Sequence, residues 1–398
     1  MNPDFDIVIL GGGLVGSSLA CALDGRGWRV AMVEGAPMRQ APPGFDDRRL
    51  ALAAASLNAL QSLDVLPRLP TAPSPIRRIH VSRQGGFGAV RLDAANSGRD
   101  AFGAVVAAHA LGVALESRLA TVRDLHMFRP AVLEAMEPVD GAWRLRLAGC
   151  AQTPVARLAV GADGTQSAVR AALGIGTEVH DYLQTLFVCS VACDREADGV
   201  AYERFTDEGP VAMLPMARDY GAICAVARDD AGRVRALEDA GYRDYLQARF
   251  GWRAGRILRV GARSAYPLVR VVASALHGTR AVLMGNAAQT IHPIGAQGFN
   301  LGLRDALTFA ELLPAQGDPG AAAVLSAYAA ARVDDRARTL AFSDGLARAT
   351  ANPSAAMHVL RSMGLVAMGH LPGLSAPLAS GAMGFRGRVP RLARGTPP

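Results

Sequence analysis

Three short glycine-rich segments hold the residues whose types and spacing could do chemistry. In the first, Gly11, Gly13 and Gly16 have the spacing G-x-G-x-x-G and directly follow the apolar run Phe5 to Leu10. The first glycine of this pattern permits a tight turn, the second lets the backbone approach a pyrophosphate, and the third lets a helix pack closely on a strand. Because the pattern lies between a strand-like and a helix-like run, it favours a dinucleotide site over a glycine turn that binds nothing.

Glu34 ends the next strand-like run, Trp28 to Glu34, close to the spacing expected of the ribose-binding carboxylate. A carboxylate there accepts hydrogen bonds from a ribose diol and disfavours a 2′-phosphate. The sequence therefore favours FAD or NAD over NADP. The helix after the glycine turn would offer free N–H groups to the phosphates.

The second segment is an Asp-Gly pair. Asp163 and Gly164 follow an apolar run that ends near Val160, and Ser167 and Arg170 would lie on a new helix. By itself, an Asp-Gly pair is an ordinary turn. Its meaning therefore depends on the other two segments.

The third segment extends from Gly285 to Asp305. A strand-like run ends at Gly285, Asn286 follows, and a loop of small residues leads to a helix expected from Gly298. Such a loop lets a flat ring lie against backbone, and the helix N-terminus stabilises negative charge at the pyrimidine end of a reduced flavin. Three glycine sites, each after a strand, are hard to explain without a bound cofactor.

Alternating strands and helices predict an α/β fold with a Rossmann-like, doubly wound parallel sheet. The expected strands include 5–10, 28–34 and 281–285, and the expected helices are 48–63, 105–119, 298–313 and 321–350. Short strands over 76–93 and 183–226, with one polar helix over 237–250, predict an interleaved antiparallel-sheet domain. We expect a FAD-binding domain over 1–75, 100–180 and 276–350, a substrate domain over 76–99 and 181–275, and a C-terminal helical and basic tail over 351–398.

The composition excludes some kinds of catalysis and makes a structural metal unexpected. All 42 basic residues are arginine, which excludes Schiff-base and nucleophile chemistry by lysine. The five cysteines form no Cys-x-x-Cys pair, so we expect reduced cysteines and no structural metal. No apolar run reaches the roughly 18 residues that span a bilayer, and the N-terminus lacks a signal-peptide pattern. The sequence predicts a cytoplasmic protein, free or peripheral to the inner face of the cytoplasmic membrane.

The formal net charge of +7 is concentrated at the C-terminus, because six arginines and no acidic residue follow Asp344. Nucleic acid is not an expected partner, since no basic helix or aromatic platform accompanies the charge. Two interpretations of the tail stay open. It is either a helix packed on the flavin domain with solvated arginines, or a basic, apolar element resting on anionic lipid.

Together, the three segments resemble the class A flavoprotein monooxygenases, whose patterns are G-x-G-x-x-G, Asp-Gly, and Gly-Asp followed by a glycine loop. Other stretches are similar to the ubiquinone-biosynthesis hydroxylases, above all the 2-polyprenyl-6-methoxyphenol hydroxylases. These stretches are Pro43 to Arg48, Arg204 to Thr206, Gly209-Pro210, Met213 to Pro215, Phe250 to Arg253, Arg263 to Leu268 and Gly285 to Gln289.

The resemblance implies aromatic-ring hydroxylation of a polyprenylated (methoxy)phenol with FAD as cofactor, NADH or NADPH as transient reductant and O₂ as co-substrate. In that class, O₂ adds at flavin C4a and the hydroperoxide transfers its distal oxygen to the ring. The cofactor supplies the difficult chemistry and the protein positions the ring. Other ubiquinone-biosynthesis proteins are the implied partners.

The resemblance also implies a set of cofactor contacts. Glu34 would hold the adenosine ribose, Arg48 the phosphate or ribityl region, and Asp163 and Asn286 the ribityl or pyrophosphate region from opposite sides. One residue departs from the family pattern, because Ala296 stands where a glycine is usual, which affects the placement of the flavin ring. The full set is Gly11, Gly13, Gly16, Glu34, Arg48, Asp163, Gly164, Gly285, Asn286, Gly295, Ala296, Gln297, Gly298 and Asn300.

A base near the flavin is expected, because an ionised or strongly hydrogen-bonded hydroxyl activates an aromatic ring. The catalytic candidates are His292 with the adjacent Pro293, and Tyr266, although a structural role for each stays open. The residues expected to border the substrate pocket are Tyr202, Arg204 and Pro215.

Three other functions compete. The chain could hydroxylate a soluble aromatic acid, which an arginine aimed at a carboxylate would favour. The flavin could instead serve a non-oxygenase reaction, such as isoprenoid reduction or a non-redox cyclisation. Finally, the chain could act as a scaffold with an inert flavin in a quinone-synthesis assembly.

Overall fold

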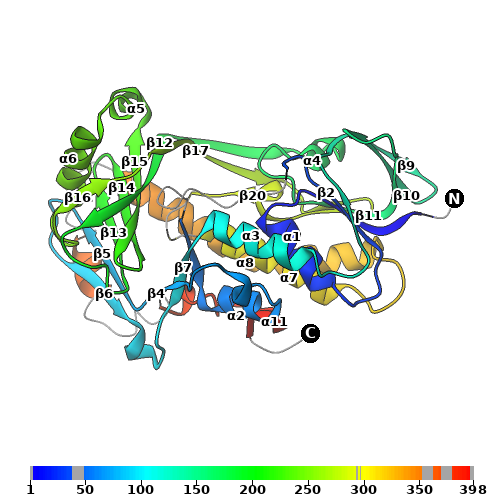
Figure 1. The fold of residues 1–398 in the computed structure, drawn as a ribbon, viewed down its shortest axis with the longest axis horizontal. Coiled ribbons are helices and arrows are strands. Elements are labelled where there is room, and N and C mark those ends of the chain that lie inside the picture. The colour runs from blue at the N-terminus through cyan, green and yellow to red at the C-terminus, as the bar shows by residue number, and fades with distance from the viewer. Residues whose placement is uncertain are drawn as a thin grey trace.

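The computed structural model describes residues 3–37, 49–292, 295, 297–351, 362–368 and 379–394, with side chains as far as 346 in the helix that ends at 351. The roles predicted for Arg48, Pro293 and Ala296 therefore lie outside the described residues. The described strands form an eight-stranded, a nine-stranded and a three-stranded sheet. Figure 1 shows the nine-stranded sheet beside α5 and α6, and the strands β1, β2 and β11 of the eight-stranded sheet at the opposite end of the molecule.

The eight-stranded sheet has a parallel centre, as the sequence predicted. β1 (Phe5–Leu10) pairs in parallel with β2 (Val30–Val33) and β11 (Val155–Gly161), and β19 (Ala281–Leu283) pairs in parallel with β11. The outer strands are β8 (Leu125–Phe128), β18 (His277–Gly278) and the hairpin β9 (Val132–Val139) and β10 (Ala142–Ala148). Because β1, β11 and β19 run in the same direction, the segments that follow them meet at one edge of the sheet.

The helices that pack together beside this sheet come from distant parts of the chain. α1 (Leu14–Leu23) packs against α3 (Ala108–Leu119) and α7 (Gln297–Leu312), and α7 packs against α8 (Ala322–Ala351). The short α4 (Ala168–Ala172) follows β11. The predicted helices over 298–313 and 321–350 are confirmed to within a residue or so.

The nine-stranded sheet is antiparallel except where β13 pairs in parallel with β5. Its strands are β5 (Arg78–Arg83), β6 (Ala89–Asp93), β12 (Thr177–Cys193), β13 (Val200–Thr206), β14 (Gly209–Met216), β15 (Asp219–Ala227), β16 (Ile257–Val260), β17 (Ser264–Ala273) and β20 (Gln289–Thr290). β12 and β17 are the longest, and Figure 1 shows them extending from the strands beside α5 and α6 toward β20 and α4. The predicted antiparallel sheet with helical cover is confirmed.

Two helices cover one face of this sheet, where the sequence predicted one over 237–250. α6 (Asp239–Phe250) matches the prediction, and α5 (Arg228–Arg235) precedes it. α5 is polar except at its buried Ala231 and Val234, so it has too few apolar positions to produce a periodic signal.

A three-stranded sheet corrects two predicted helix starts. β3 (Arg49–Ala53) and β4 (Ser74–Ile76) both pair with β7 (Gly103–Ala107), so α2 (Ala54–Ser62) and α3 begin later than predicted. The sequence analysis missed β3 and β7 because both are short and rich in alanine or valine, and each continues directly into a helix. Gly103 permits the pairing, since a Cβ there would lie 2.0 Å from the Leu52 carbonyl oxygen. Single 3-10 turns occupy Leu66–Arg68, Ala94–Ser97 and Gly285–Ala287.

The end of the tail packs on helices α2 and α7. α11 (Arg391–Arg394) lies on α2, where Asn58 and Ser62 donate hydrogen bonds to the carbonyl oxygens of Ala393 and Leu392, over 3.2 and 3.3 Å. Residues 362–368 and 379–382 are also helical. Among the described residues, no helix is both long and apolar enough to cross a bilayer.

A buried ionic network joins α7, α8 and the turn after β19. The Asp305 carboxylate lies 2.7 Å from Arg332 Nε, and it accepts hydrogen bonds from Gly285 N over 3.1 Å and from Gln289 Nε2 over 2.7 Å. Asp335 in turn lies 2.8 Å from both Arg332 and Arg304. Burial alone would raise the pKa of Asp335, but these two arginines hold that pKa below its usual value. Asp335 therefore stays ionised inside the protein.

We expect Asp305→Asn to destabilise the protein by about 3 kcal/mol, because breaking a buried ion pair leaves the buried Arg332 guanidinium undercompensated. Urea denaturation at neutral pH measures the effect. Asp334→Asn on the exposed face of α8 is the matched control and should stay within about 0.5 kcal/mol of the wild type. Equal urea midpoints for the two variants would show that the network is not a main support of this helix pair.

Candidate active site

The first glycine turn is packed against the second segment. Gly11 has a φ of +105°, and a Cβ there would lie 2.4 Å from the Ala162 carbonyl oxygen. A Cβ on Gly16 would lie 2.0 Å from the Gly11 carbonyl oxygen. Side chains are therefore excluded at both positions by neighbouring backbone. By contrast, a Cβ on Gly13 would meet nothing within 4 Å, so this face of the turn is open.

Glu34 lies beside the same turn, at the carboxyl end of β2. Its carboxylate accepts hydrogen bonds from Gly12 N over 2.6 Å and from Ala36 N over 2.7 Å. These bonds fix the carboxylate against the glycine turn. A carboxylate oxygen has more than one acceptor position, so the group keeps capacity for ribose hydroxyls.

Asp163 presents a buried oxygen that has no donor among the described residues. One carboxylate oxygen, Oδ2, accepts a hydrogen bond from Val169 N over 3.1 Å, whereas Oδ1 is buried without a hydrogen-bond partner. Leaving a buried acceptor unsatisfied costs about 1–3 kcal/mol. The next residue, Gly164, has a φ of +86° and open space in front of it. This arrangement suits a ligand that carries hydroxyl groups.

The Asp305 network and close helix packing hold the third turn in place. Gly285 has a φ of +57°, and Cβ atoms on Gly285 and Gly302 would lie 3.0 and 2.8 Å from a methyl group of Val15 in α1. The side chain of Asn286 is exposed beside this turn. The turn thus brings the start of α7 close to the start of α1.

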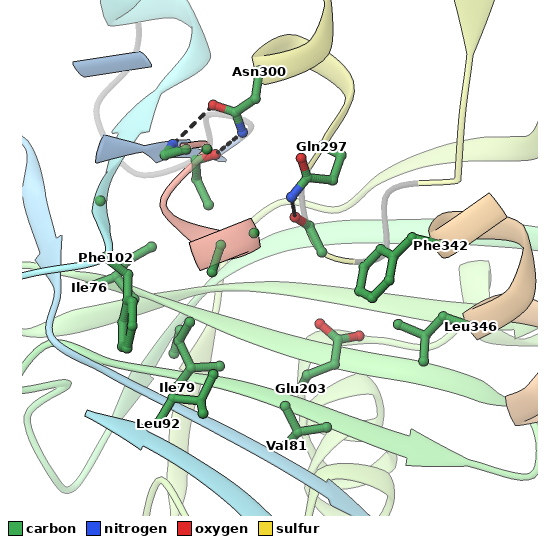
Figure 2. A pocket seen from close by; sticks show the side chains of 18 of the residues that line it. Ile76, Ile79, Val81, Leu92, Phe102, Glu203, Gln297, Asn300, Phe342 and Leu346 are labelled. Atoms are coloured by element: carbon green, nitrogen blue, oxygen red, sulfur yellow. Dashed lines mark hydrogen bonds between the residues drawn. The ribbon is translucent and has the colours of Figure 1, made fainter. Parts of the chain in front are cut away.

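Asn300 makes hydrogen bonds to three residues near the start of α2. Its Oδ1 accepts from Ala53 N over 3.0 Å and from Ser56 Oγ over 2.7 Å, and its Nδ2 donates to the Ala51 carbonyl oxygen over 2.9 Å. The side chain therefore fastens β3 and α2 to α7. Nearer the loop, Gln297 Nε2 donates to the Gly295 carbonyl oxygen over 3.1 Å, as Figure 2 shows.

The residues of the three turns fit an extended dinucleotide. Gly13, Gly164 and Gly298 belong to the three different segments, and a Cβ on each would meet no protein atom within 4 Å. The unsatisfied Asp163 oxygen and the carboxylate of Glu34 provide acceptors for hydroxyl groups. The first turns of α1 and α7 provide N–H donors for anionic groups.

A cavity of about 420 Å³ lies between the third turn, the nine-stranded sheet and α8. Gly295, Gln297 and Asn300 border it on the side of the turn. Residues at helical spacing along α8 form a second wall, namely Asp335, Arg338, Thr339, Phe342 and Leu346. Leu365, Met368 and parts of the segment 381–386 also line it, so the C-terminal region completes the cavity.

The sheet side of the cavity is apolar except at one position. Alternate residues of five strands face it, namely Ile79, Val81, Val90, Leu92, Ala201, Glu203, Phe205, Ala212, Leu214 and Ile223. Figure 2 shows Glu203 and Val81 on the sheet side, with Phe342, Leu346 and Gln297 across from them. The sequence analysis missed Glu203. The signal was available, because strand alternation places Glu203 on the same face as Ala201 and Phe205.

The residues predicted to border the substrate pocket differ in position. Tyr202 borders the cavity, and its hydroxyl donates to the Arg253 carbonyl oxygen over 3.3 Å. Arg204 is not among the described lining residues, and its guanidinium donates to Ser82 Oγ over 3.3 Å. Pro215 is buried in β14 and also lies outside the lining. As a result, only Tyr202 of the three borders the cavity.

The two side chains predicted to act as a base lie away from the described cavity lining. His292 is only 1% exposed, and its ring centroid lies 4.9 Å from that of Tyr182. Burial lowers the pKa of His292 to about 4, and Asp344 opposes the shift only in part, so the imidazole is neutral near pH 7. Tyr266 lies on β17 and is 44% exposed.

Comparison with known proteins gives consistent matches over most of the chain. A family model described as an FAD binding domain matches residues 4–343. The chain is 35% identical over 402 residues to the ubiquinone hydroxylase UbiL of Rhodospirillum rubrum, covering 98% of this chain and 93% of that protein. It is 30% identical over 376 residues to the 3-demethoxyubiquinol 3-hydroxylase of Escherichia coli, covering 92% and 95% of the two chains.

Two solved structures show how widely this fold is used. The p-nitrophenol 4-monooxygenase PnpA of Pseudomonas putida matches with a TM-score of 0.78 and 19% identity, covering 98% of this chain and 100% of that one. The Diels-Alderase PyrE3 of pyrroindomycin biosynthesis matches with a TM-score of 0.75 and 21% identity, covering 98% and 82%. The fold by itself therefore does not fix the reaction.

The fold and the three turns together define an FAD-dependent enzyme of the monooxygenase type. The chain belongs to the FAD binding domain family, and within it to the ubiquinone-biosynthesis hydroxylases. The resemblance noted in the sequence is thereby confirmed.

We expect Asp163→Asn to weaken FAD binding about tenfold, because the amide cannot accept hydrogen bonds at both of its polar atoms. Titration calorimetry of the apoprotein with FAD measures the change. Asp229→Asn, at an exposed position in the first turn of α5, is the control and should bind FAD like the wild type. An unchanged affinity in Asp163→Asn would mean that this carboxylate does not contact the cofactor.

Proposed function

We propose that this protein hydroxylates the aromatic ring of a polyprenylated phenol in ubiquinone biosynthesis, with FAD as cofactor. The cavity is the observation that carries the proposal, since it extends from the glycine loop to an apolar sheet wall. A ring must reach the flavin, and a prenyl tail needs apolar walls that exclude water. The named activities of the two curated relatives support the same substrate class.

The overall reaction uses O₂ and NADH or NADPH. NAD(P)H supplies two electrons, one oxygen atom replaces an aromatic hydrogen as hydroxyl, and the other leaves as water with one added proton. Bound FAD supplies the oxygen-activating chemistry. The chain's own residues bind and orient the reactants and keep water out.

Each group of residues has a role in this proposal. Glu34 and Asp163 bind hydroxyl groups of the cofactor, and the open faces of Gly13 and Gly298 admit it close to backbone. The α7 N-terminus stabilises negative charge near the loop. We assign residues 1–75, 100–180 and 276–350 to flavin binding and residues 76–99 and 181–275 to substrate binding. The tail 351–398 adds cavity wall through Leu365 and Met368.

We also propose peripheral contact with an anionic membrane, because a polyprenyl substrate resides in lipid. The contact would lie at the tip of the β5–β6 hairpin, where Phe87 is 57% exposed, and at Met363, which is 58% exposed. The hairpin tip and the tail meet here, since a Cβ on Gly88 would lie 2.7 Å from Val366. The arginine-rich end is less available, because Glu311 holds it on α7: Arg388 forms an ion pair with Glu311, and the backbone N–H of Arg391 donates a hydrogen bond to the same carboxylate.

Hydroxylation of an aromatic acid is the second candidate. Arg338 and Arg386 are exposed at the cavity edge and could pair with a carboxylate. A carboxylate-bearing ring would then enter with its acid group toward these arginines. The two candidates therefore differ in what occupies the end of the cavity far from the glycine loop. The prenyl tail would fill that end with apolar groups.

One experiment tests the substrate class and the membrane contact together. FAD-loaded protein is given NADH or NADPH, O₂ and a short-chain 2-prenyl-6-methoxyphenol in anionic vesicles, with a hydroxybenzoic acid as the alternative substrate. We expect ring-hydroxylated prenylphenol with one NAD(P)H oxidised per product, and protein that sediments with the vesicles. Product from the acid alone would favour the second candidate, and no hydroxylated product from either would overturn the oxygenase proposal. Protein left in the supernatant would contradict the membrane contact.

A further inference from the structure

Glu203 is the one acidic side chain on the sheet side of the cavity among the described residues. It lies in the centre of β13, and strand pairing places it in a row across four other strands. Its direct partners are Val81 of β5 and Ala212 of β14, and the row continues to Val90 and Ile223. All four of these neighbours are apolar and also line the cavity.

The Glu203 carboxylate has no hydrogen bond or ion pair within the described part of the chain. The other charged groups that border the cavity come from α7, α8 and the C-terminal segment. Arg304 and Asp335 are paired with each other over 2.8 Å, while Arg338 and Arg386 are exposed. Tyr202, on the same strand as Glu203, uses its hydroxyl to reach the Arg253 carbonyl oxygen.

An unpaired carboxyl group in an apolar wall is unfavourable for the protein alone. Its surroundings suggest a role toward a ligand, because the side chain faces the space in which a substrate ring would lie (Figure 2). Burial raises the pKa of Glu203 to about 7. The group therefore exchanges its proton near neutral pH, which is the useful range for a general base.

We propose that Glu203 is a catalytic residue that accepts the hydrogen bond, and then the proton, of the substrate's phenolic hydroxyl. This inference rests on the proposed function. The phenolic O–H bond breaks, an O–H bond forms on the carboxylate, and the electron pair stays on the phenolic oxygen. The ring becomes more electron-rich at the positions ortho and para to that oxygen. When the hydroxylated ring carbon loses its hydrogen as H⁺ to solvent, the Glu203 proton returns to the phenolic oxygen.

The geometry explains why a carboxylate suits this place. A ring between the glycine loop and the sheet would have apolar contacts on the sheet side except at Glu203, so a single polar group would set its orientation. The prenyl tail would then lie along the apolar remainder of the cavity. Glu203 would thus determine both which ring oxygen is activated and which ring carbon faces the loop.

The test compares Glu203→Gln with the wild type under saturating FAD, NAD(P)H and prenylphenol. In the wild type we expect the hydroxylation rate to rise with pH through about 7, as the carboxylate ionises. Glu203→Gln should lose this pH dependence and be about 100-fold slower at pH 8, the typical contribution of a general base. Glu196→Gln, an exposed acid paired with Arg218, is the control and should behave like the wild type.

A second measurement does not depend on turnover. A carboxyl group whose pKa is raised by folding lowers the free energy of unfolding as the pH rises from its ordinary pKa toward about 7. Above about pH 7 this effect on the free energy of unfolding stays constant. The melting temperature of Glu203→Gln should therefore exceed that of the wild type at pH 8, with a smaller difference at pH 4.5. Equal differences at both pH values would contradict the half-buried, unpaired state of Glu203.

The outcomes separate this inference from the proposed function. If the wild type forms product and Glu203→Gln matches its rate and pH profile, Glu203 is not the base and the inference fails. If the wild type hydroxylates no phenol, the proposed function itself fails.

Binding of the phenol and of its methyl ether gives a further check. The wild type should bind the phenol about tenfold more tightly than the ether, and Glu203→Gln should show a smaller preference; a preference equal to that of the wild type would count against the inference.

Discussion

The buried carboxylate of Asp305 is the interaction on which the rest of the site depends. It accepts a hydrogen bond from the backbone of Gly285, and it pairs with Arg332 of α8. The turn after β19 is therefore fixed to the same helices that form a cavity wall. A buried ion pair contributes little net stability by itself. Its value here is that it sets the position of the third turn relative to α7 and α8, and so the position of a flavin relative to the cavity.

The cavity follows from how the two larger sheets and α8 are arranged. Parallel strands bring three turns to one edge, and the nine-stranded sheet turns an apolar face toward the third of them. α8 spans 30 residues and presents Thr339, Phe342 and Leu346 to the same space. The C-terminal segment closes the remaining side with Leu365 and Met368. In this view the chain supplies a shaped cavity that excludes water, with one carboxyl group on its sheet side, and the cofactor supplies the oxygen chemistry.

Local signals in the sequence predicted the three glycine turns, because each turn has a glycine with a positive φ: Gly11, Gly164 and Gly285. The parallel sheet and the antiparallel sheet followed from the order of the strands. The strands β3 and β7 were not predictable, since pairing between distant segments decided their structure. Strand alternation placed Glu203 on the same face as Ala201 and Phe205, so its position in β13 was predictable. Its other apolar neighbours were not, because they come from four other strands. His292 and Tyr266 were chosen for their residue types, and only the packing shows that neither lines the cavity.

The most direct test of the account is a crystal structure of the protein with FAD and a short-chain prenylphenol. The account predicts a cofactor hydroxyl within hydrogen-bond distance of Asp163 Oδ1. It also predicts the phenol ring between the glycine loop and the sheet, with its hydroxyl at Glu203. A flavin bound away from the three turns, or a phenol bound outside the cavity, would contradict it.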